Sequence, residues 1–372
     1  MIKPARTVRV VQLINGLGIG GGERLLAETV SRLEGTGFEF KVYCLTREGP
    51  LADELRAIGV PVRRLTWNGV PKPWELLRFA ADLRAADVLH SHFFYSDLLA
   101  ALAGRTLAVP RRLATRHELG TWMGRVHRKV EPWVYGSFDR VLCVSHAVAE
   151  SLLERGVEPQ RLATVLPGVA EIAGLDPDAD TGIDPPYIIG LGRLEPVKGT
   201  DLLVDAFARL AKDTALDATR LVIVGDGSQR AALERQARRL GVAERVSFLG
   251  EVERESTARL LRGAALFVLP SRSEAFGLSL LEAMQLGRPC VAARIGGVPE
   301  IVDDGATGLL FEAGDVSQLA TAMRALLVDS DRAARLGEAA RHHVDENFSI
   351  DRFVQRVGEM YDGSSIDRQV RR

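Results

Sequence analysis

The sequence predicts an α/β protein built from two doubly wound domains, each with a parallel sheet covered by helices. Short β-branched or apolar runs alternate with longer helical patterns along most of the 372 residues. Such alternation implies parallel strands joined by right-handed crossovers. A stretch rich in Asp, Gly and Pro interrupts the series at residues 169–186, and the alternation begins again at Tyr187. The length suits two domains of ordinary size, with ligands expected at the carboxyl ends of the strands.

The individual elements follow from hydrophobic periodicity. Six strands are expected before the interruption, at residues 8–14, 40–45, 62–65, 87–90, 111–116 and 140–145. Six more are expected after it, at residues 187–192, 220–225, 246–250, 265–270, 290–294 and 307–311. Helical patterns such as those at residues 22–33, 74–84 and 147–156 separate the strands of the first half, and residues 315–348 are expected to be helical. We therefore expect a first domain at 1–168, a linker at 169–186, a second domain at 187–348, a final helix at 349–362 and a frayed tail at 363–372.

The composition is that of an ordinary globular protein, with 46% apolar and 26% charged residues. No apolar run approaches the roughly 18 residues that a membrane span requires. The first residues pass directly into a strand pattern, so we expect no signal peptide. Cys44, Cys143 and Cys290 are isolated in strand-like runs. They predict buried thiols in a reducing compartment, and hence a cytoplasmic protein.

Charge is distributed unevenly over the two halves. Residues 1–170 contain 23 basic and 17 acidic side chains, whereas the remainder contains 25 basic and 32 acidic ones. The excess of positive charge in the first half indicates an anionic partner for that half. A chance imbalance on solvated faces is the alternative, and no nucleic-acid partner is expected.

The segment 270–300, PSRSEAFGLSLLEAMQLGRPCVAARIGGVPE, carries the most specific pattern of the chain. Glu274 lies in the loop that leaves a buried strand, and Glu282 lies on the helix that follows. A helix start presents unpaired N–H groups and a partial positive charge, which suit a phosphate. Two carboxylates beside it can accept hydrogen bonds from hydroxyls, so the pair suits a ligand that is part phosphate and part sugar. Two solvated glutamates around an ordinary turn are the alternative.

A second phosphate candidate is the loop GLGRLEPVKGTDLL at residues 190–203. Arg193 and Lys198 lie five residues apart between a buried strand and a helix. Two cations at a helix start suit a diphosphate leaving group, whose charge they would neutralise without a metal. Ordinary surface cations are the alternative.

The first Gly-rich loop, NGLGIGGGERL, follows the first strand. Gly16, Gly18 and Gly21 match the G-x-G-x-x-G fingerprint of dinucleotide-binding proteins. The acidic residue that normally supports this fingerprint is expected at the end of the second strand, and Glu48 lies slightly beyond that point. A tight strand-to-helix turn that needs glycine fits the loop equally well.

Three histidines fall at neighbouring strand ends. His90 and His92 share one face of a strand, and His117 ends the next strand. A cluster of this kind can contact a substrate, and H-x-H with a third His can also bind zinc. We rank zinc lower because the phosphate loops already account for the site. Asp176, Asp178 and Asp180 form a D-x-D pattern in the linker, which we interpret as a solvated acidic turn.

Residues 122–138 interleave cations with aromatic side chains. The cations are Arg125, Arg128 and Lys129, and the aromatic residues include Trp122, Trp133 and Tyr135. This pattern suits peripheral contact with an anionic membrane surface or lipid carrier. An ordinary amphipathic helix over the sheet is the alternative, and it is slightly favoured.

Taken together, these motifs resemble the family-4 retaining glycosyltransferases (group 1, GT-B fold). The resemblance extends over nearly the whole chain and includes the GGGE loop, H-x-H, R-H, G-R-L-x3-K-G, E-x7-E and GGVPE. It implies two Rossmann-like domains facing across a cleft, an acceptor-binding first domain and a donor-binding second domain. It also implies that the last helix crosses back onto the first domain.

The resemblance assigns roles to individual residues. It implies that His117, Glu274, Arg193 and Lys198 are catalytic, with His90, His92 and His117 on the acceptor side. The implied donor-binding set is Gly21, Gly22, Glu23, Gly192, Arg193, Lys198, Gly225, Gly227, Glu251, Val252, Glu274, Phe276, Gly277, Leu278 and Glu282. Glu282 would accept hydrogen bonds from the ribose, and Glu274 would hold hydroxyls of the transferred sugar.

The implied activity is retaining, metal-independent transfer of a hexose from a UDP- or GDP-linked donor to a hydroxyl of a sugar or lipid-linked acceptor. It would serve glycan, polysaccharide or glycolipid synthesis, with the nucleotide sugar as co-substrate and no cofactor. A nucleotide-sugar epimerase of the same architecture is one alternative. An NAD-dependent oxidoreductase using the first Gly-rich loop is another, although it leaves Arg193, Lys198, Glu274 and Glu282 without a role. A non-catalytic sugar-nucleotide-binding module is a third.

Overall fold

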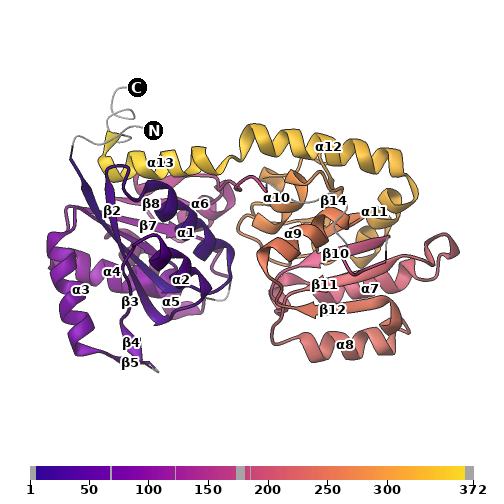
Figure 1. Cartoon of the computed structure of the whole chain (residues 1–372), viewed down its shortest axis with the longest axis horizontal. Coiled ribbons are helices and arrows are strands. Elements are labelled where there is room, and N and C mark those ends of the chain that lie inside the picture. Colours follow the sequence, from indigo (N-terminus) through magenta and orange to yellow (C-terminus); the bar gives the residue numbers. More distant parts are fainter. Residues whose placement is uncertain (1–5, 68, 122, 173–180, 185, 365–372) are drawn as a thin grey trace. The chain divides into compact units, whose positions relative to one another are not determined.

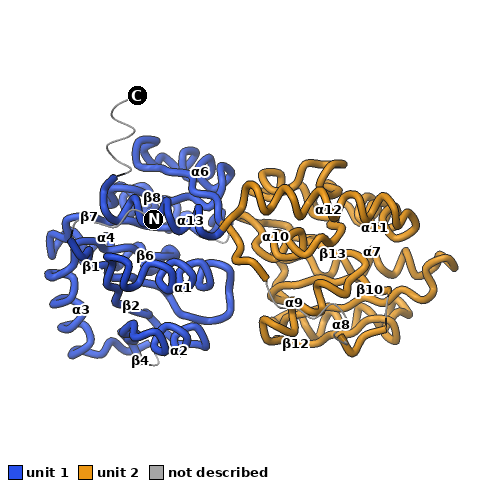
Figure 2. The backbone as a smooth tube through the Cα atoms, turned by 45° about the horizontal axis from the view of Figure 1, so that its top comes forward, with its two compact units in different colours: residues 1–167, 350–372 blue, residues 168–349 orange. Residues whose placement is uncertain are grey.

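The computed structural model describes residues 6–67, 69–121, 123–172, 181–184 and 186–364. The chain forms two compact units, unit 1 with residues 1–167 and 350–372 and unit 2 with residues 168–349 (Figure 2). Each unit contains one parallel sheet with helices packed on it, which confirms the predicted fold class (Figure 1). The D-x-D pattern at Asp176, Asp178 and Asp180, and most of the predicted tail, lie outside the described residues.

Unit 1 is built on a seven-stranded parallel sheet with the order β3-β2-β1-β6-β7-β8-β9. Its strands are β1 (Val8–Gly16), β2 (Phe38–Arg47), β3 (Val62–Arg64), β6 (Val88–His92), β7 (Arg111–Arg116), β8 (Arg140–Cys143) and β9 (Leu162–Thr164). A small hairpin, β4 (Thr66–Trp67) and β5 (Val70–Pro71), follows β3. The strand order reverses between β1 and β6, which is where ligands bind in sheets of this kind.

Helices cover both faces of this sheet. They are α1 (Gly21–Leu33), α2 (Pro50–Ala57), α3 (Pro73–Ala85), α4 (Phe94–Thr106), α5 (Arg125–Tyr135), α6 (His146–Leu153) and α13 (Ile350–Asp362). The order of the strands and right-handed crossovers place α1 and α2 on one face and α3 to α6 on the other. The alternation of β2 agrees, because Phe38 and Phe40 contact Tyr361 of α13 whereas Tyr43 contacts Phe79 of α3.

Unit 2 is built on a six-stranded parallel sheet with the order β12-β11-β10-β13-β14-β15. Its strands are β10 (Tyr187–Leu191), β11 (Arg220–Val224), β12 (Val246–Gly250), β13 (Leu266–Leu269), β14 (Cys290–Arg294) and β15 (Leu309–Glu312). Its helices are α7 (Thr200–Leu210), α8 (Arg230–Arg239), α9 (Arg254–Gly263), α10 (Leu278–Gln285), α11 (Val316–Val328) and α12 (Ser330–Asn347). Here the order reverses between β10 and β13.

Buried apolar strands explain why the series of strands could be predicted. The side chains of β10, β11, β13 and β14 are almost wholly buried, as continuous apolar runs in a two-sided parallel sheet should be. All twelve expected strands are present. The predicted helical stretch 315–348 is divided at Asp329, whose carboxylate accepts a hydrogen bond from the backbone N–H of Arg332 and caps α12.

The last helix returns to unit 1 after the whole of unit 2 has been traversed. Phe353, Val354, Val357 and Tyr361 of α13 are buried, and the helix packs against α1 and β1. The Tyr361 ring lies at an angle to the rings of Phe38 and Phe40, with centroids 5.9 and 6.0 Å away. Within the described residues, no helix is both long enough and apolar enough to pass through a lipid bilayer.

Candidate functional site

The predicted donor residues of unit 2 lie at the carboxyl ends of its central strands. The loop after β10 contains Arg193 and Lys198, and the loop after the neighbouring β13 contains Glu274. A small cavity at this end of the sheet is lined by residues of both loops, including Gly192, Lys198 and Pro270. The sequence motifs that are about 80 residues apart therefore meet because β10 and β13 are neighbours in the parallel sheet.

Lys198 and Glu274 form an ion pair across these loops. Nζ of Lys198 donates a hydrogen bond to Oε2 of Glu274 over 2.7 Å, and the Ser271 hydroxyl donates to the same oxygen over 3.0 Å. The side chains are 25% and 12% exposed, so solvent reaches both. Lys198 thus lines the cavity, and its hydrogen bond holds the carboxylate of Glu274 next to it in a fixed arrangement that solvent can reach.

Backbone contacts lock the two loops together. Gly199 has φ = 66°, and a Cβ at this position would lie 2.0 Å from the carbonyl oxygen of Pro270. The N–H of Arg272 donates to the carbonyl of Val197 over 2.8 Å. Only glycine permits both the left-handed backbone and the close approach at residue 199, so the glycine after Lys198 fixes the position of the Lys198 loop against the Glu274 loop.

Helix α10 starts directly beside this ion pair. Gly277 is its N-cap with φ = 119°, and Leu278 is its first residue. Phe276 is 3% exposed and packs against Phe348 with ring centroids 5.9 Å apart. Glu282 lies on the second turn of α10 and is partly buried. The predicted N–H groups of residues 276–278 therefore lie at a helix start, as the sequence indicated.

The remaining predicted donor residues surround the same strand ends. The loops after β10 and β11 are joined by backbone hydrogen bonds from Gly192 to Val224 and from Leu194 to Asp226, over 3.0 and 2.9 Å. Gly225 then donates to the carbonyl of Gly250 at the end of β12 over 2.7 Å. This places Gly192, Gly225, Gly227, Glu251 and Val252 in three adjacent connected loops. Arg193 and Glu251 are exposed.

In unit 1 the start of α1 packs directly on His117. A Cβ on Gly22 would lie 2.7 Å from Cζ of Phe93, 2.9 Å from Cγ of His117 and 3.0 Å from its Nδ1. Residue 22 must therefore be glycine for the helix to approach these rings. The predicted residues Gly21, Gly22 and Glu23 form the first turn of α1, and the Glu23 carboxylate folds back toward Gly20. The structure thus brings the Gly-rich loop and the histidine cluster together.

A continuous chain of hydrogen bonds runs from His117 to the last helix. Nε2 of His117 lies 3.0 Å from Nδ1 of His92, and Nε2 of His92 lies 2.9 Å from Oε1 of Gln12. Nε2 of Gln12 donates to the Tyr361 hydroxyl over 2.7 Å. That hydroxyl lies 2.7 Å from Nδ1 of His90, whose Nε2 lies 2.7 Å from the Thr115 hydroxyl. All of the ring nitrogens of His90 and His92 are therefore occupied by protein groups.

The chain also fixes which ring nitrogens carry hydrogen. With Oε1 of Gln12 as an acceptor, His92 carries its hydrogen on Nε2, and its Nδ1 accepts a hydrogen bond from Nε2–H of His117. The lone pair of His117 is then on Nδ1, the atom beside Gly22. Burial lowers the pKa of His117 and of His90 to about 3, and it lowers the pKa of His92 well below its ordinary value. The cluster is therefore neutral at physiological pH.

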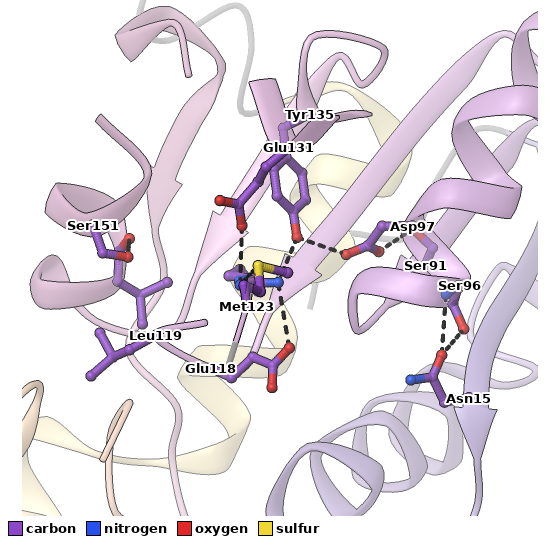
Figure 3. A network of polar contacts seen from close by, with 12 residues as sticks. Asn15, Ser91, Ser96, Asp97, Glu118, Leu119, Met123, Glu131, Tyr135 and Ser151 are labelled. Atoms are coloured by element: carbon purple, nitrogen blue, oxygen red, sulfur yellow. Dashed lines mark hydrogen bonds and ion pairs between the residues drawn. The ribbon is translucent and has the colours of Figure 1, made fainter. Parts of the chain in front are cut away.

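Arg116, the residue before His117, is fully buried and anchored in a polar network. Figure 3 shows Glu118, Glu131, Tyr135 and Asp97 of this network. Its guanidinium pairs with Glu131 over 3.1 Å and with Glu118 over 3.5 Å, and it donates to the Tyr135 hydroxyl over 3.0 Å. Tyr135 in turn donates to Asp97 over 2.9 Å. Burial raises the pKa of Asp97 to about 7. The network fixes the end of β7, and with it the backbone of His117, because the loss of any one partner would leave a buried charge uncompensated.

The sequence did not reveal several members of this site. Gln12 carried a signal, because a polar residue inside the apolar run VRVVQLI must be satisfied if the strand is buried. Phe93 has φ = 70°, a strained conformation for a non-glycine residue that sequence patterns do not disclose. Tyr361 is 349 residues from Gln12, so only the fold brings it to the histidines.

The described part of the chain contains no arrangement of ligands that supports the zinc alternative for the histidines. Among those residues, no three His, Cys, Asp or Glu side chains are placed to share a metal ion. His92 and His117 direct nitrogen atoms at one another over 3.0 Å, which engages them in a mutual hydrogen bond. The three cysteines are buried and unpaired.

Comparison with known families gives two matches that together cover most of the chain. The family described as glycosyl transferases group 1 matches residues 178–343, and the family described as glycosyltransferase family 4 matches residues 19–171. A D-inositol 3-phosphate glycosyltransferase 2 of Catenulispora acidiphila is 31% identical over 377 residues, which cover 88% of this chain and 87% of the relative. The D-inositol 3-phosphate glycosyltransferase of Nocardia farcinica is 32% identical, with 88% of this chain and 82% of the relative covered.

Solved structures share the fold at lower sequence identity. Anabaena HepE in complex with UDP and glucose superposes with a TM-score of 0.82 and 20% identity over 96% of this chain and all of that one. Sucrose-phosphate synthase of Thermosynechococcus elongatus superposes with a TM-score of 0.78 and 22% identity over the same shares. At these identities the likeness concerns the fold.

Proposed function

This chain belongs to the group 1 glycosyltransferases of family 4 and has their GT-B fold, and on that premise we propose that it transfers a sugar from a UDP- or GDP-linked donor to a hydroxyl of its acceptor with retention of anomeric configuration. The observation that carries the proposal is the Lys198–Glu274 pair at the carboxyl ends of β10 and β13. One cation for a diphosphate and one carboxylate for sugar hydroxyls lie side by side there, next to the start of α10.

The proposed chemistry assigns each group a separate task. Lys198, together with Arg193 in the same loop, neutralises the charge that develops on the departing diphosphate. Glu274 accepts hydrogen bonds from hydroxyls of the transferred sugar, and Glu282 accepts them from the ribose. N–H groups at residues 276–278 hold a phosphate. Because the departing phosphate oxygen can take the acceptor proton on the same face of the sugar, the reaction needs neither a general base from the chain nor a metal.

We assign the acceptor side to the histidine cluster of unit 1. His117 is the member of the cluster that touches the Gly22 turn, and its unprotonated Nδ1 faces that turn. A neutral imidazole with a free lone pair can accept a hydrogen bond from a sugar hydroxyl. The relatives are named D-inositol 3-phosphate glycosyltransferases, so a polyol phosphate is the first acceptor to test beside sugars and lipid-linked sugars.

A donor and acceptor screen tests this proposal. Thermal-shift measurements with UDP, GDP and their sugars should raise the melting temperature for one base, since a ligand that prefers the folded protein stabilises it. With that donor and an acceptor panel, NMR of the product should report the anomeric configuration of the donor, and EDTA should leave the rate unchanged.

The same screen separates the alternatives. Isomerisation of the donor without an acceptor would identify an epimerase, and stabilisation by NAD with no response to nucleotide sugars would identify an oxidoreductase. Binding without transfer or hydrolysis would identify a non-catalytic module. An inverted product, or a rate that EDTA abolishes, would reject the retaining, metal-independent mechanism.

A further inference from the structure

One face of unit 1 has an unusual distribution of charge. The helices α3, α4 and α5 cover this face, and their cationic side chains Arg78, Arg84, Arg105, Arg125, Arg128 and Lys129 are exposed. These helices contain four carboxylates. The side chains of Glu131 and Glu75 are 0% and 11% exposed, that of Asp82 is 21% exposed, and Asp97 is fully buried. We call the outward surface of α3, α4 and α5 the basic face.

Each carboxylate on these helices is engaged inside the unit. Glu131 pairs with Arg116 and Arg155, and Asp97 accepts hydrogen bonds from Ser91 and Tyr135. Asp82 pairs with Lys41 of β2 over 2.7 Å. Glu75 pairs with Arg78, so the charge of this one cation of the basic face is partly neutralised. The fold thus turns the negative charges of these helices inward and leaves the positive ones outside.

The opposite face of the same unit does not share this property. There α1, α2 and α13 expose carboxylates, with the side chains of Asp53, Glu54 and Asp351 being 82%, 52% and 84% exposed. Exposed cations such as Arg352 and Arg356 stand among them. The basic face ends at α6, where Glu150 is exposed. The asymmetry therefore belongs to three particular helices.

Large apolar side chains stand between the cations on the basic face. On α3, Trp74 and Leu77 are 59% and 73% exposed, and on α5, Val126 and Trp133 are 74% and 46% exposed. On α5, residues 125, 129 and 133 follow at i, i+4 and i+8, so Arg125, Lys129 and Trp133 form one stripe beside Val126. Cations alternating with exposed aromatic and aliphatic side chains are typical of helices that lie in a membrane interface.

We propose that the basic face docks unit 1 onto an anionic lipid bilayer. The cations would attract the headgroups, and the apolar side chains of α3 and α5 would enter the region between headgroups and acyl chains. A symmetric dimer through this face is disfavoured, because two such faces would repel each other. A duplex nucleic acid offers no apolar surface for Leu77, Val126 and Trp133. The inference does not depend on the proposed transfer reaction.

Co-sedimentation with vesicles tests the proposal directly. The full chain should bind vesicles containing 30% phosphatidylglycerol and not pure phosphatidylcholine vesicles, and binding should weaken as salt is raised. Each cation near an anionic surface contributes about fivefold in affinity. The double variant R125E/K129E should therefore lose at least about 25-fold. The matched control R352E/R356E reverses two exposed charges on the opposite face and should bind as the unaltered chain does.

A second measurement reports insertion. Tryptophan fluorescence should be quenched by brominated lipids in anionic vesicles, and part of this quenching should disappear in W133F. Equal binding to both vesicle types, no binding, or equal losses in the two double variants would overturn the proposal. So would binding to a duplex oligonucleotide or an acidic polypeptide in the absence of vesicle binding. Thermal melting of every variant checks that the exposed substitutions leave the fold intact.

Discussion

Nζ of Lys198 lies 2.7 Å from Oε2 of Glu274, so the cation assigned to the diphosphate and the carboxylate assigned to the sugar hold each other in place. The Ser271 hydroxyl donates to the same carboxylate oxygen. Each side chain is thereby fixed by protein groups, which reduces the ordering that donor binding would require. The Lys198–Glu274 pair is therefore the first feature of unit 2 to test by mutation.

Truncation of Lys198 to alanine should lower kcat for sugar transfer by about 10²- to 10³-fold, the usual effect of removing one group that stabilises developing charge. Both units should remain folded, because the side chain lies at the surface of a cavity. Steady-state kinetics with the identified donor measure the effect. Lys212, an exposed lysine of the same unit, supplies the control variant K212A. Unchanged turnover in K198A would remove Lys198 from the mechanism.

Glycine 22 offers a test that separates the two interpretations of the first Gly-rich loop. In G22A the new Cβ would lie under 3.0 Å from Phe93 and His117, so the start of α1 must move away from the histidines. We expect a loss of transfer activity of at least about 10-fold, since such a displacement affects a positioned group.

Gly18 is the matched control, since a Cβ there meets only the end of Arg47 at 3.7 Å. G18A should retain activity. The G-x-G-x-x-G interpretation makes the opposite prediction, because Gly18 belongs to that fingerprint and Gly22 does not. Kinetics of the two variants, with NAD binding measured in parallel, decide between them.

Removal of the Tyr361 hydroxyl should weaken both the stability of unit 1 and its histidine site. In Y361F the amide of Gln12 and Nδ1 of His90 lose their buried partner, which costs roughly 1–3 kcal/mol for each unsatisfied group. Differential scanning calorimetry should show a lower melting temperature. Selective ¹⁵N labelling of histidine should show a changed signal of the His117 ring, since its tautomer is set through His92 and Gln12.

The half-exposed Tyr95 provides a control, since Y95F keeps its ring contacts with Phe94 and His127. A Y361F protein with an unchanged His117 signal would show that the hydrogen-bond chain does not determine the state of that ring. A lower melting temperature alone would then mean that the Tyr361 hydroxyl stabilises unit 1 without setting the state of the His117 ring.

Acid should destabilise unit 1 through its buried histidines. Their folded-state pKa values lie below the ordinary value, so between pH 6.5 and about 3 the unfolded chain binds more protons than the folded one. Stability must then fall as the pH falls through this window. Asp97 has the opposite effect on the pH dependence of stability. Its pKa is raised to about 7, so the folded state binds an extra proton between pH 4 and 7. D97N should therefore show a steeper loss of melting temperature between pH 7 and 5.

Melting temperatures measured across this pH range for the unaltered chain and D97N check the signs. A melting temperature that rises on acidification in both proteins would contradict the buried, neutral state of the histidines. Identical slopes in the two proteins would mean that Asp97 does not take up a proton in this range.

The elements that the sequence predicts well are those whose pattern is local. The strands of unit 2 are apolar runs bounded by glycine, and the pair Arg193–Lys198 lies within one such boundary. The short edge strand β9 and helix α2, which begins with Pro50, were not predicted, because three and eight residues carry too little periodicity. The roles of the predicted site residues remain predictions.

Contacts between distant segments account for the features of unit 1 that the sequence does not predict. Pairing of Arg116 with Glu131 places a guanidinium where a strand pattern leads one to expect an apolar side chain. Phe93 has its strained backbone at the junction between the end of β6 and the start of α4. Such features depend on which strands become neighbours in the sheet. A local pattern along the chain does not specify these neighbours; the topology of the whole unit does.

The insertion of unit 2 between β9 and α13 imposes an order on synthesis. Gln12 and His90 leave the ribosome early, whereas Tyr361 follows only after the entire second sheet has been translated. Until α13 has been synthesised, nascent unit 1 therefore exposes an apolar groove on β1 and α1, which this last helix fills in the folded protein. Premature termination anywhere in unit 2 would leave that groove permanently uncovered, and such fragments should be substrates for chaperones and proteases.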